Sequence, residues 1–151
     1  MTLSFAINPS AFKPTVVTTQ GSNATTETAT VTFKDLSVGQ SVTINGLTLT
    51  ATAALSATQV AAAYANATSG STPTNPTGGT FAGSLSGFST GANTGGSLVF
   101  TSSTANLNVT DLAVSVTSKK LTIPAGLDKA SEIVATINAA GLGVNAQLVN
   151  T

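Results

Sequence analysis

Residues 41–50 read Ser-Val-Thr-Ile-Asn-Gly-Leu-Thr-Leu-Thr, and this stretch decides the fold class. Apolar and hydroxyl side chains alternate on both sides of Asn45-Gly46, as they do in two strands that share one buried face. Asn and Gly tolerate the positive φ angles of a type I′ turn, so the pair is a strong signal for a two-residue hairpin. The stretch therefore predicts an antiparallel β-hairpin.

The same period-two alternation recurs along most of the chain and predicts further strands. We expect them over residues 28–33, 81–88, 95–101, 108–117, 121–123 and 144–149. Two amphipathic segments interrupt this pattern. Ser56-Ala-Thr-Gln59 has the form of a capping box and predicts a helix near residues 56–66, and Asp128 can cap a second helix near residues 129–140. The sequence therefore predicts a mainly β fold, an antiparallel β-sandwich with two short capping α-helices.

The N-terminal stretch is set apart from this body by prolines. Leu3, Phe5 and Ile7 alternate with polar residues and predict a short strand, and a second extended piece follows it. We therefore expect residues 1–20 to form an extended arm and a candidate donor strand. Residues 21–151 are then expected to form a single β-sandwich domain that carries both helices.

Composition narrows the possible functions. The chain has no His, Cys, Trp or Arg, and residues 36–110 contain no charged side chain. Five Lys and five acidic residues give a net charge of zero, so no electrostatic field favours nucleic acid. No stretch approaches 18 consecutive apolar residues, so we expect no membrane span. A net charge near zero promotes association, which suits a subunit that assembles; the alternative is a soluble module solvated by its many hydroxyl and amide groups.

Few side chains could perform catalysis or bind a metal. General acid–base and nucleophilic catalysis need a neighbouring group whose pKa the protein can shift. The carboxylates of this chain are instead explained by structural roles, since they fall in turns or at a helix cap. We therefore predict no enzymatic activity, no catalytic residue and no cofactor. Asp35 and Asp111 are weak candidates for a calcium site if their turns are adjacent, but turn formation is the favoured interpretation. Tyr64 could line a sugar platform, although core packing is the favoured use at a helical position.

Two segments resemble known families. The first segment resembles a repeat module of bacterial surface-layer and type I-secreted adhesin proteins. The resemblance lies in Val-Thr-Phe-Lys-Asp-Leu from Val31, in the strand Gly-Leu-Thr-Leu-Thr-Ala and in Ala-Thr-Gln-Val-Ala-Ala-Ala-Tyr-Ala-Asn. Residues 121–149, with Ile-Asn followed by Gly-Leu-Gly-Val-Asn-Ala, resemble the short insertion motif of flagellins and hook-associated proteins. The chain lacks the calcium-binding nonapeptides of repeats-in-toxin proteins and the long terminal coiled coils of flagellins. The resemblance implies an extracellular or bacterial cell-surface location, with type I secretion without a cleaved N-terminal signal as one route.

These observations together predict a non-enzymatic structural subunit of an extracellular bacterial filament or surface layer. We expect it to assemble with copies of itself by β-strand complementation, in which Leu3, Phe5 and Ile7 add to the sheet edge of a neighbour. The alternative for this strand is pairing within its own domain. Two other functions remain open at this stage: an adhesin or carbohydrate-binding module that contacts a host surface or glycan, and a phage virion or tail structural protein.

Overall fold

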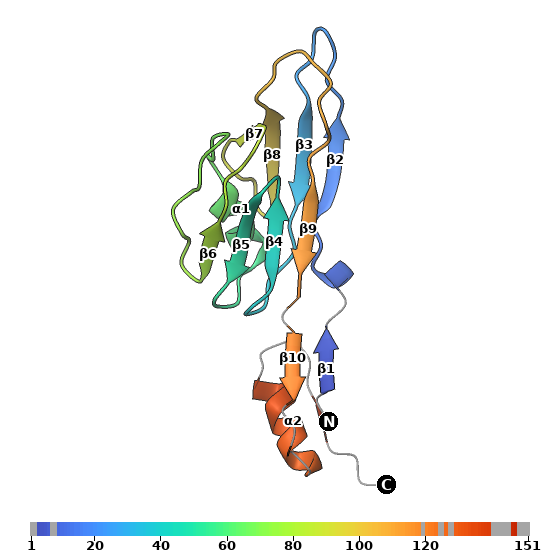
Figure 1. Cartoon of the computed structure of the whole chain (residues 1–151). Coiled ribbons are helices and arrows are strands. Elements are labelled where there is room, and N and C mark those ends of the chain that lie inside the picture. Colours follow the sequence, from blue (N-terminus) through green and yellow to red (C-terminus); the bar gives the residue numbers. More distant parts are fainter. Residues whose placement is uncertain are drawn as a thin grey trace.

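The computed structural model describes residues 3–6, 9–118, 120–123, 126, 129–139 and 146–147. It confirms a mainly β, antiparallel fold with two short α-helices (Figure 1). In chain order the elements are β1 (Leu3–Ala6), η1 (Pro9–Ala11, a 3-10 helix), β2 (Thr15–Thr19), β3 (Thr28–Thr32), β4 (Ser41–Ile44), β5 (Leu47–Ala51), α1 (Ala57–Tyr64), β6 (Gly79–Ala82), β7 (Phe88–Thr90), β8 (Ser97–Ser102), β9 (Val114–Thr117), β10 (Lys120–Ile123) and α2 (Ala130–Ala139).

Two four-stranded antiparallel sheets form the body of the molecule. One has the strand order β2-β3-β8-β7 and the other has the order β6-β5-β4-β9. Alternate side chains of the inner strands point into a common core, where Val31, Ile44, Leu49 and Phe100 are fully buried or nearly so. This arrangement is the β-sandwich that the alternation predicts, with two inner faces that pack together.

The hairpin at residues 41–50 forms as predicted. Asn45 and Gly46 have φ angles of 40° and 90°, which are the positive values that a type I′ turn requires. The Asn45 side chain also ties two distant segments to this turn. Its Oδ1 accepts the N–H of Ala113 at 2.7 Å, and its Nδ2 donates to the carbonyl oxygen of Ser86 at 2.9 Å.

Hydroxyl groups occupy the outward positions of the hairpin and pair across its strands. The Ser41 and Thr50 hydroxyl oxygens lie 2.9 Å apart, and those of Thr43 and Thr48 lie 2.7 Å apart. Cross-strand hydroxyl pairs of this kind stabilise a sheet on its solvent side. The outer face of the hairpin is thus held together by neutral groups.

Helix α1 fills the sandwich between β6 and β8. It begins with the predicted capping box, in which the Ser56 hydroxyl accepts the N–H of Gln59 and the Gln59 side chain accepts the N–H of Ser56. The helix buries its Tyr64 ring among three Phe rings from different parts of the chain. The ring centroids lie 5.5, 5.2 and 6.4 Å from those of Phe33, Phe81 and Phe100.

The structure corrects two strand predictions. Residues 81–88 do not form one strand, because β6 and β7 belong to different sheets. Gly83 and Gly87, with φ angles of 77° and 74°, lie in the connection that crosses between the sheets. Residues 108–117 are a strand only in β9, since side chains take the N–H groups that precede it. Glu27 Oε2 accepts the N–H of Val109 at 3.0 Å, and Asn45 accepts that of Ala113.

The N-terminal region also differs from the expected arm of residues 1–20. Strand β2 pairs with β3 along its whole length, so it belongs to the sandwich rather than to an arm. Only β1 lies apart, beside β10 and beyond one end of the sandwich (Figure 1). Helix α2 contacts β10. The predicted closing strand at 144–149 and the predicted cap at Asp128 lie outside the described residues.

Candidate functional site

The segment with the clearest potential for assembly is the strand pair β1–β10. The two strands are antiparallel in the register Leu3↔Ile123, Ser4↔Thr122, Phe5↔Leu121 and Ala6↔Lys120. Within the described part of the chain, no third strand joins this pair. A two-stranded sheet is marginally stable on its own in water. The pair is therefore the weakest of the three described sheets and the one most able to open.

The predicted interface residues Leu3 and Phe5 occupy alternate positions of β1, and Ile7 lies outside the described residues. In this structure β1 pairs within its own chain, as one of the two sequence-based interpretations expected. The helix beside the pair adds little cover. No described side chain of α2 is fully buried, and its apolar residues Ile133 and Ile137 are half-buried.

The two weak metal candidates are far apart in the fold. Asp35 Oδ1 accepts the N–H of Ala57 at 2.7 Å, where the carboxylate faces the first turn of α1. Asp111 Oδ1 accepts the side-chain N–H of Gln20 at 3.0 Å. Asp111 is close to the Asn45 end of β4, whereas Asp35 lies at the Ser41 end, so the structure does not bring them together. Among the described residues, no group of three or more acidic, His or Cys side chains could hold a metal ion.

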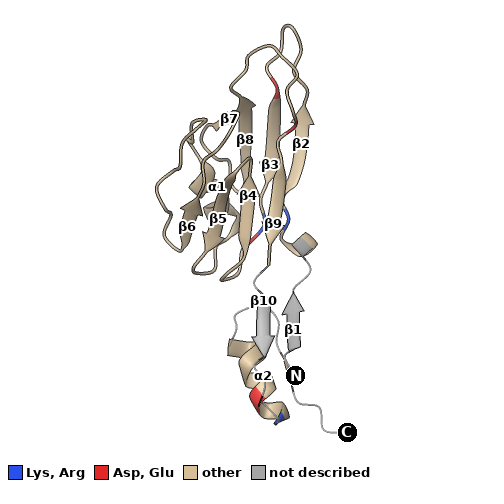
Figure 2. Cartoon of the chain, viewed as in Figure 1, with Lys and Arg blue, Asp and Glu red and all other residues tan. Residues whose placement is uncertain are grey.

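Charged residues are sparse in the part of the chain that the structure describes (Figure 2). The figure shows acidic and basic residues in connections, at strand ends and in the α2 region, while the strands of the two sandwich sheets are almost free of charge. Among the described residues one ion pair forms, between Lys129 and Glu132 of the α2 region at 4.0 Å, and both side chains are exposed. Exposed pairs of this kind contribute little stability.

Glu27 is a buried carboxylate that was not predicted from the sequence as a site residue. It is fully buried immediately before β3, where one side-chain oxygen accepts the N–H of Val109. Its other oxygen, Oε1, has no hydrogen-bond partner in the described structure. The strand alternation contained the signal for this burial, because Glu27 precedes β3 in phase with the inward residues Ala29 and Val31. Its contact with Val109 fixes the segment that leads to β9.

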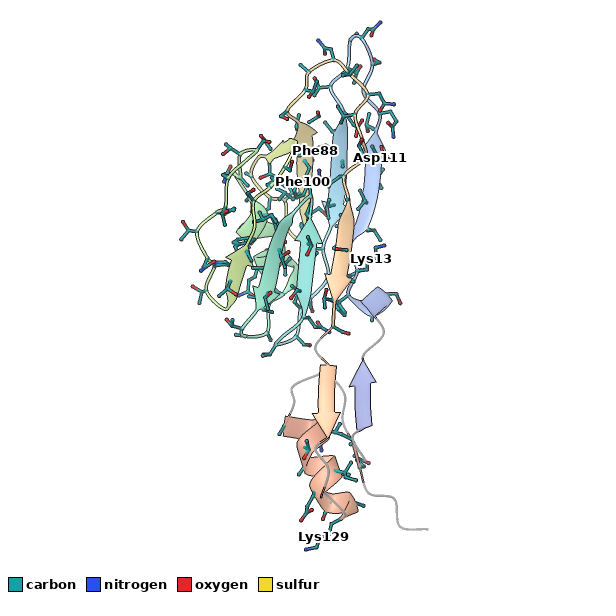
Figure 3. The ribbon with its side chains drawn as sticks, viewed as in Figure 1. Lys13, Phe88, Phe100, Asp111 and Lys129 are labelled. Atoms are coloured by element: carbon teal, nitrogen blue, oxygen red, sulfur yellow. The ribbon has the colours of Figure 1, made fainter. Side chains whose placement is uncertain are left out.

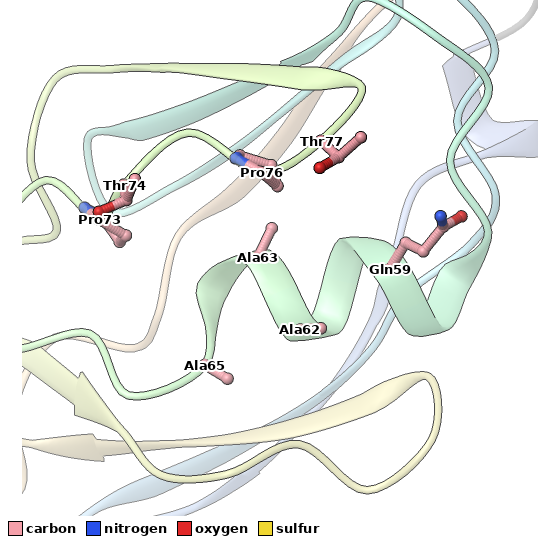
Figure 4. Close-up of a pocket in the computed structure, with 8 residues that line it drawn as sticks. All are labelled: Gln59, Ala62, Ala63, Ala65, Pro73, Thr74, Pro76 and Thr77. Carbon is pink, nitrogen blue, oxygen red and sulfur yellow. The ribbon is translucent and has the colours of Figure 1, made fainter.

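A groove with a volume of about 410 Å³ lies between α1 and the segment 73–77 (Figure 4). The helix side supplies Gln59 and three alanines, and the other side supplies two prolines and two threonines. The side-chain oxygen Oε1 of Gln59 already accepts the N–H of Ser56 at 2.9 Å. No charged or aromatic side chain lines the groove, so it lacks the stacking surface on which sugar rings commonly bind.

Tyr64 is a core residue, which confirms the favoured interpretation of its position. Its ring is fully buried, and its hydroxyl bridges the paired residues Val42 and Leu49 of the hairpin. The hydroxyl donates to the carbonyl oxygen of Val42 at 2.8 Å and accepts the N–H of Leu49 at 3.2 Å. Burial raises the pKa of the Tyr64 phenol far above its ordinary value, while the Leu49 hydrogen bond lowers it by a smaller amount.

This burial predicts a loss of stability in alkali. The unfolded phenol ionises near pH 10, whereas folded Tyr64 keeps its proton, so the contribution to stability is present below about pH 10 and is lost above it, by about 1.4 kcal/mol per pH unit. The Tyr64→Phe variant should lack this part of the loss when both proteins are unfolded in urea across that range. The chain has one Tyr and no Trp, so phenolate absorbance reports Tyr64 alone. Phenolate absorbance from the folded protein near pH 10 would contradict the prediction.

No helix in the described parts of the chain combines the length and the hydropathy needed to cross a bilayer. Comparison of the chain with known protein families, with curated proteins and with solved structures finds no match.

Proposed function

We propose that the protein is a non-enzymatic structural subunit of an extracellular bacterial filament or surface layer that assembles by β-strand complementation. The observation that carries this proposal is the position of β1. Among the described residues, the strand lies outside both sandwich sheets and pairs with β10 alone. The extracellular location rests on the resemblance to surface-layer and adhesin modules.

Assembly proceeds by exchange of β1 between copies. In the single chain β1 pairs with its own β10; in the polymer it pairs with β10 of the next copy, in the same register of Leu3 with Ile123 through Ala6 with Lys120. Because the exchanged strand makes identical contacts, swapping costs little free energy. Each copy donates one strand and accepts one. Such a head-to-tail contact continues as an open filament unless a rotation closes it into a ring.

The surface composition supports association of copies. Residues 36–110, which include most of the sandwich, carry no charge, and the net charge of the whole chain is zero. Copies therefore approach one another without long-range repulsion. The neutral outer face of the β4–β5 hairpin is consistent with close packing of neighbours.

A carbohydrate-binding module is the alternative, and the groove beside α1 is the feature that would serve it. The groove offers one amide and two Thr hydroxyls but no aromatic ring. We therefore favour the structural subunit. A phage virion protein would use the same strand exchange, so that alternative differs in the particle that is built rather than in the contact.

A disulfide pair tests the exchange directly, because the natural chain has no Cys. Ser4→Cys and Thr122→Cys place two thiols at directly opposed positions of β1 and β10. Opposed residues of antiparallel strands lie at a separation that a disulfide can span. We expect oxidation of dilute protein to give closed monomers. Oxidation of concentrated, assembled protein should give ladders of linked chains on a non-reducing gel.

The control pair is Ser41→Cys with Thr50→Cys in the β4–β5 hairpin, where the hydroxyls lie 2.9 Å apart. Its disulfide should stay within one chain at every concentration. Negative-stain microscopy and sedimentation show whether polymers are present. Polymers whose Ser4–Thr122 disulfides all lie within single chains would refute strand exchange, and protein that stays monomeric at high concentration would refute assembly itself.

A further inference from the structure

The sandwich has four outer strands, and three of them are protected from pairing with another chain. Strand β7 has only three residues. The outer side of β6 is capped, because Asn75 Oδ1 accepts the N–H of Phe81 at 2.6 Å. The 3-10 helix η1 contacts β9. Short strands and covered edges are the usual means by which proteins avoid uncontrolled pairing.

Strand β2 has none of these protections. Its sequence, Thr-Val-Val-Thr-Thr, contains five β-branched residues and neither a charge nor a proline. Its register with β3 runs without a bulge from Thr15 to Thr19. No described segment forms a backbone hydrogen bond to its outer side. An edge of this kind is a template for a further strand.

The hydrogen bonds of β3 show which groups this edge offers. The N–H of Phe33 donates to the carbonyl oxygen of Gly96 at 2.9 Å, and the N–H of Ser102 donates to that of Glu27 at 2.9 Å. Backbone groups of a strand alternate in direction, so odd-numbered residues of β3 bond to β8 and even-numbered residues bond to β2. Their partners on β2 are Thr15, Val17 and Thr19. The N–H and C=O groups that remain on the open side are therefore those of Val16 and Thr18.

The exposure of the β2 side chains also indicates that this edge is an interface. Val17 is 70% exposed, more than any other large apolar side chain described. The strand register places Val17, Thr30 and Val99 in one row across the outer face of β2, β3 and β8. Val99 is also exposed, at 45%. This row ends in Val17 at the open edge, where a partner strand would continue it.

We propose that two copies of the chain pair antiparallel through β2, about a two-fold axis at Val17. Val16 of each copy then lies opposite Thr18 of the other, and these are the residues whose backbone groups face the open side. Val17 lies opposite Val17 in a pair without backbone hydrogen bonds, where side chains are closest. The two four-stranded sheets become one continuous eight-stranded sheet. The contact is isologous and does not depend on the exchange of β1.

Charge supports a second copy in this orientation. The exposed Lys13 precedes β2, and the exposed Asp111 is bonded to Gln20 just after it. Figure 3 shows both labelled side chains on the same flank of the sandwich, toward opposite ends of β2. In the antiparallel arrangement about Val17, Lys13 of one copy faces Gly21 of the other, next to Gln20 and its Asp111. Parallel pairing would instead place Lys13 against Lys13. Opposite charges therefore favour antiparallel pairing.

The test uses the full chain in which the Ser4–Thr122 disulfide, formed in dilute solution, keeps β1 on its own β10. Sedimentation velocity should then show a reversible dimer. Val17→Lys and Val17→Glu each place like charges opposite one another, and each should weaken the dimer about tenfold or more. An equimolar mixture of the two variants should restore it, because Lys then lies opposite Glu. Val17→Thr keeps a β-branched residue and is the matched control that should still dimerise.

The expected attraction between Lys13 of one copy and Asp111 of the other is tested by charge reversal. Lys13→Asp alone should weaken the dimer and Asp111→Lys alone should do the same, whereas the double exchange should recover it. A locked chain that stays monomeric at high concentration, or Val17→Lys and Val17→Glu proteins that dimerise as the parent does, would overturn the β2 interface. Either result leaves the disulfide ladders of β1 exchange unaffected. Conversely, a dimer in the locked chain without ladders in the unlocked chain would support β2 pairing and refute exchange.

Discussion

Replacement of Tyr64 by alanine is expected to lower the free energy of unfolding by about 3–5 kcal/mol, the range seen when a large buried aromatic ring is removed. The ring is fully buried and packs against Phe33, Phe81 and Phe100, which come from both sheets and their connections. Its removal leaves a cavity where α1 joins the sandwich. The expected loss is a large fraction of the stability of a typical domain. Urea unfolding followed by far-UV circular dichroism measures it.

The Tyr64→Phe variant separates the hydroxyl from the ring. It keeps the packing but leaves the buried N–H of Leu49 without the hydroxyl that accepts from it. We expect a loss of about 0.5–1.5 kcal/mol, the net contribution of a buried hydrogen bond, because the N–H of Leu49 also faces its ladder partner Val42. Val99→Ala is the matched surface control, since a 45% exposed side chain of the outer face should change stability by about 0.5 kcal/mol or less. A Tyr64→Phe protein as stable as the parent would show that the hydroxyl contacts contribute nothing.

The second large effect is expected from Gly21→Ala. A Cβ atom at Gly21 would overlap the backbone carbonyl of Leu107 and lie 2.9 Å from the backbone nitrogen of Asn108. The obstacle is main chain, which cannot rotate away as a side chain does. The segment from Leu107 to Asp111 would have to move, and its bonds to Glu27 and Gln20 would be strained. We expect a loss of about 3 kcal/mol, the upper end of the cost of overpacking.

Gly91→Ala is the matched control for this substitution. No atom lies within 4 Å of a Cβ at Gly91, and its φ angle is not in the left-handed region. That variant should unfold at the same urea concentration as the parent. Equal stability of the Gly21→Ala and Gly91→Ala proteins would mean that the segment from Leu107 to Asp111 moves aside without cost.

The sequence predicts those elements whose causes are local. The Asn45-Gly46 turn depends on two adjacent residues, and the α1 start depends on Ser56 and Gln59. The predictions are wrong where the conformation of a segment depends on side chains that are distant in the sequence. Residues 108–113 alternate as a strand does, but side chains of Glu27 and Asn45 take the N–H groups that strand pairing would need. No local pattern shows that these side chains will be near.

The candidate sites also depend on segments that are distant in the sequence. The alternation of Leu3 and Phe5 predicts that β1 is a strand, but its partner β10 is more than a hundred residues away, so the pairing is not visible in any local window. The open edge of β2 is likewise a property of the assembled sheet. Its sequence shows a β-branched strand, and only the strand order shows that no described strand lies on its outer side. Glu27 could have been found, because it falls on the inward phase of the strand that follows.

The hydroxyl pairs on the outer face of the β4–β5 hairpin have one further consequence. Dissolved ions screen attractions between charges but have little effect on hydrogen bonds between uncharged groups. The hydroxyl pairs that join Ser41 to Thr50 and Thr43 to Thr48 are of this uncharged kind. The outer face of this hairpin should therefore keep its stability from very low to very high salt concentration, which a hairpin held by ion pairs would not do.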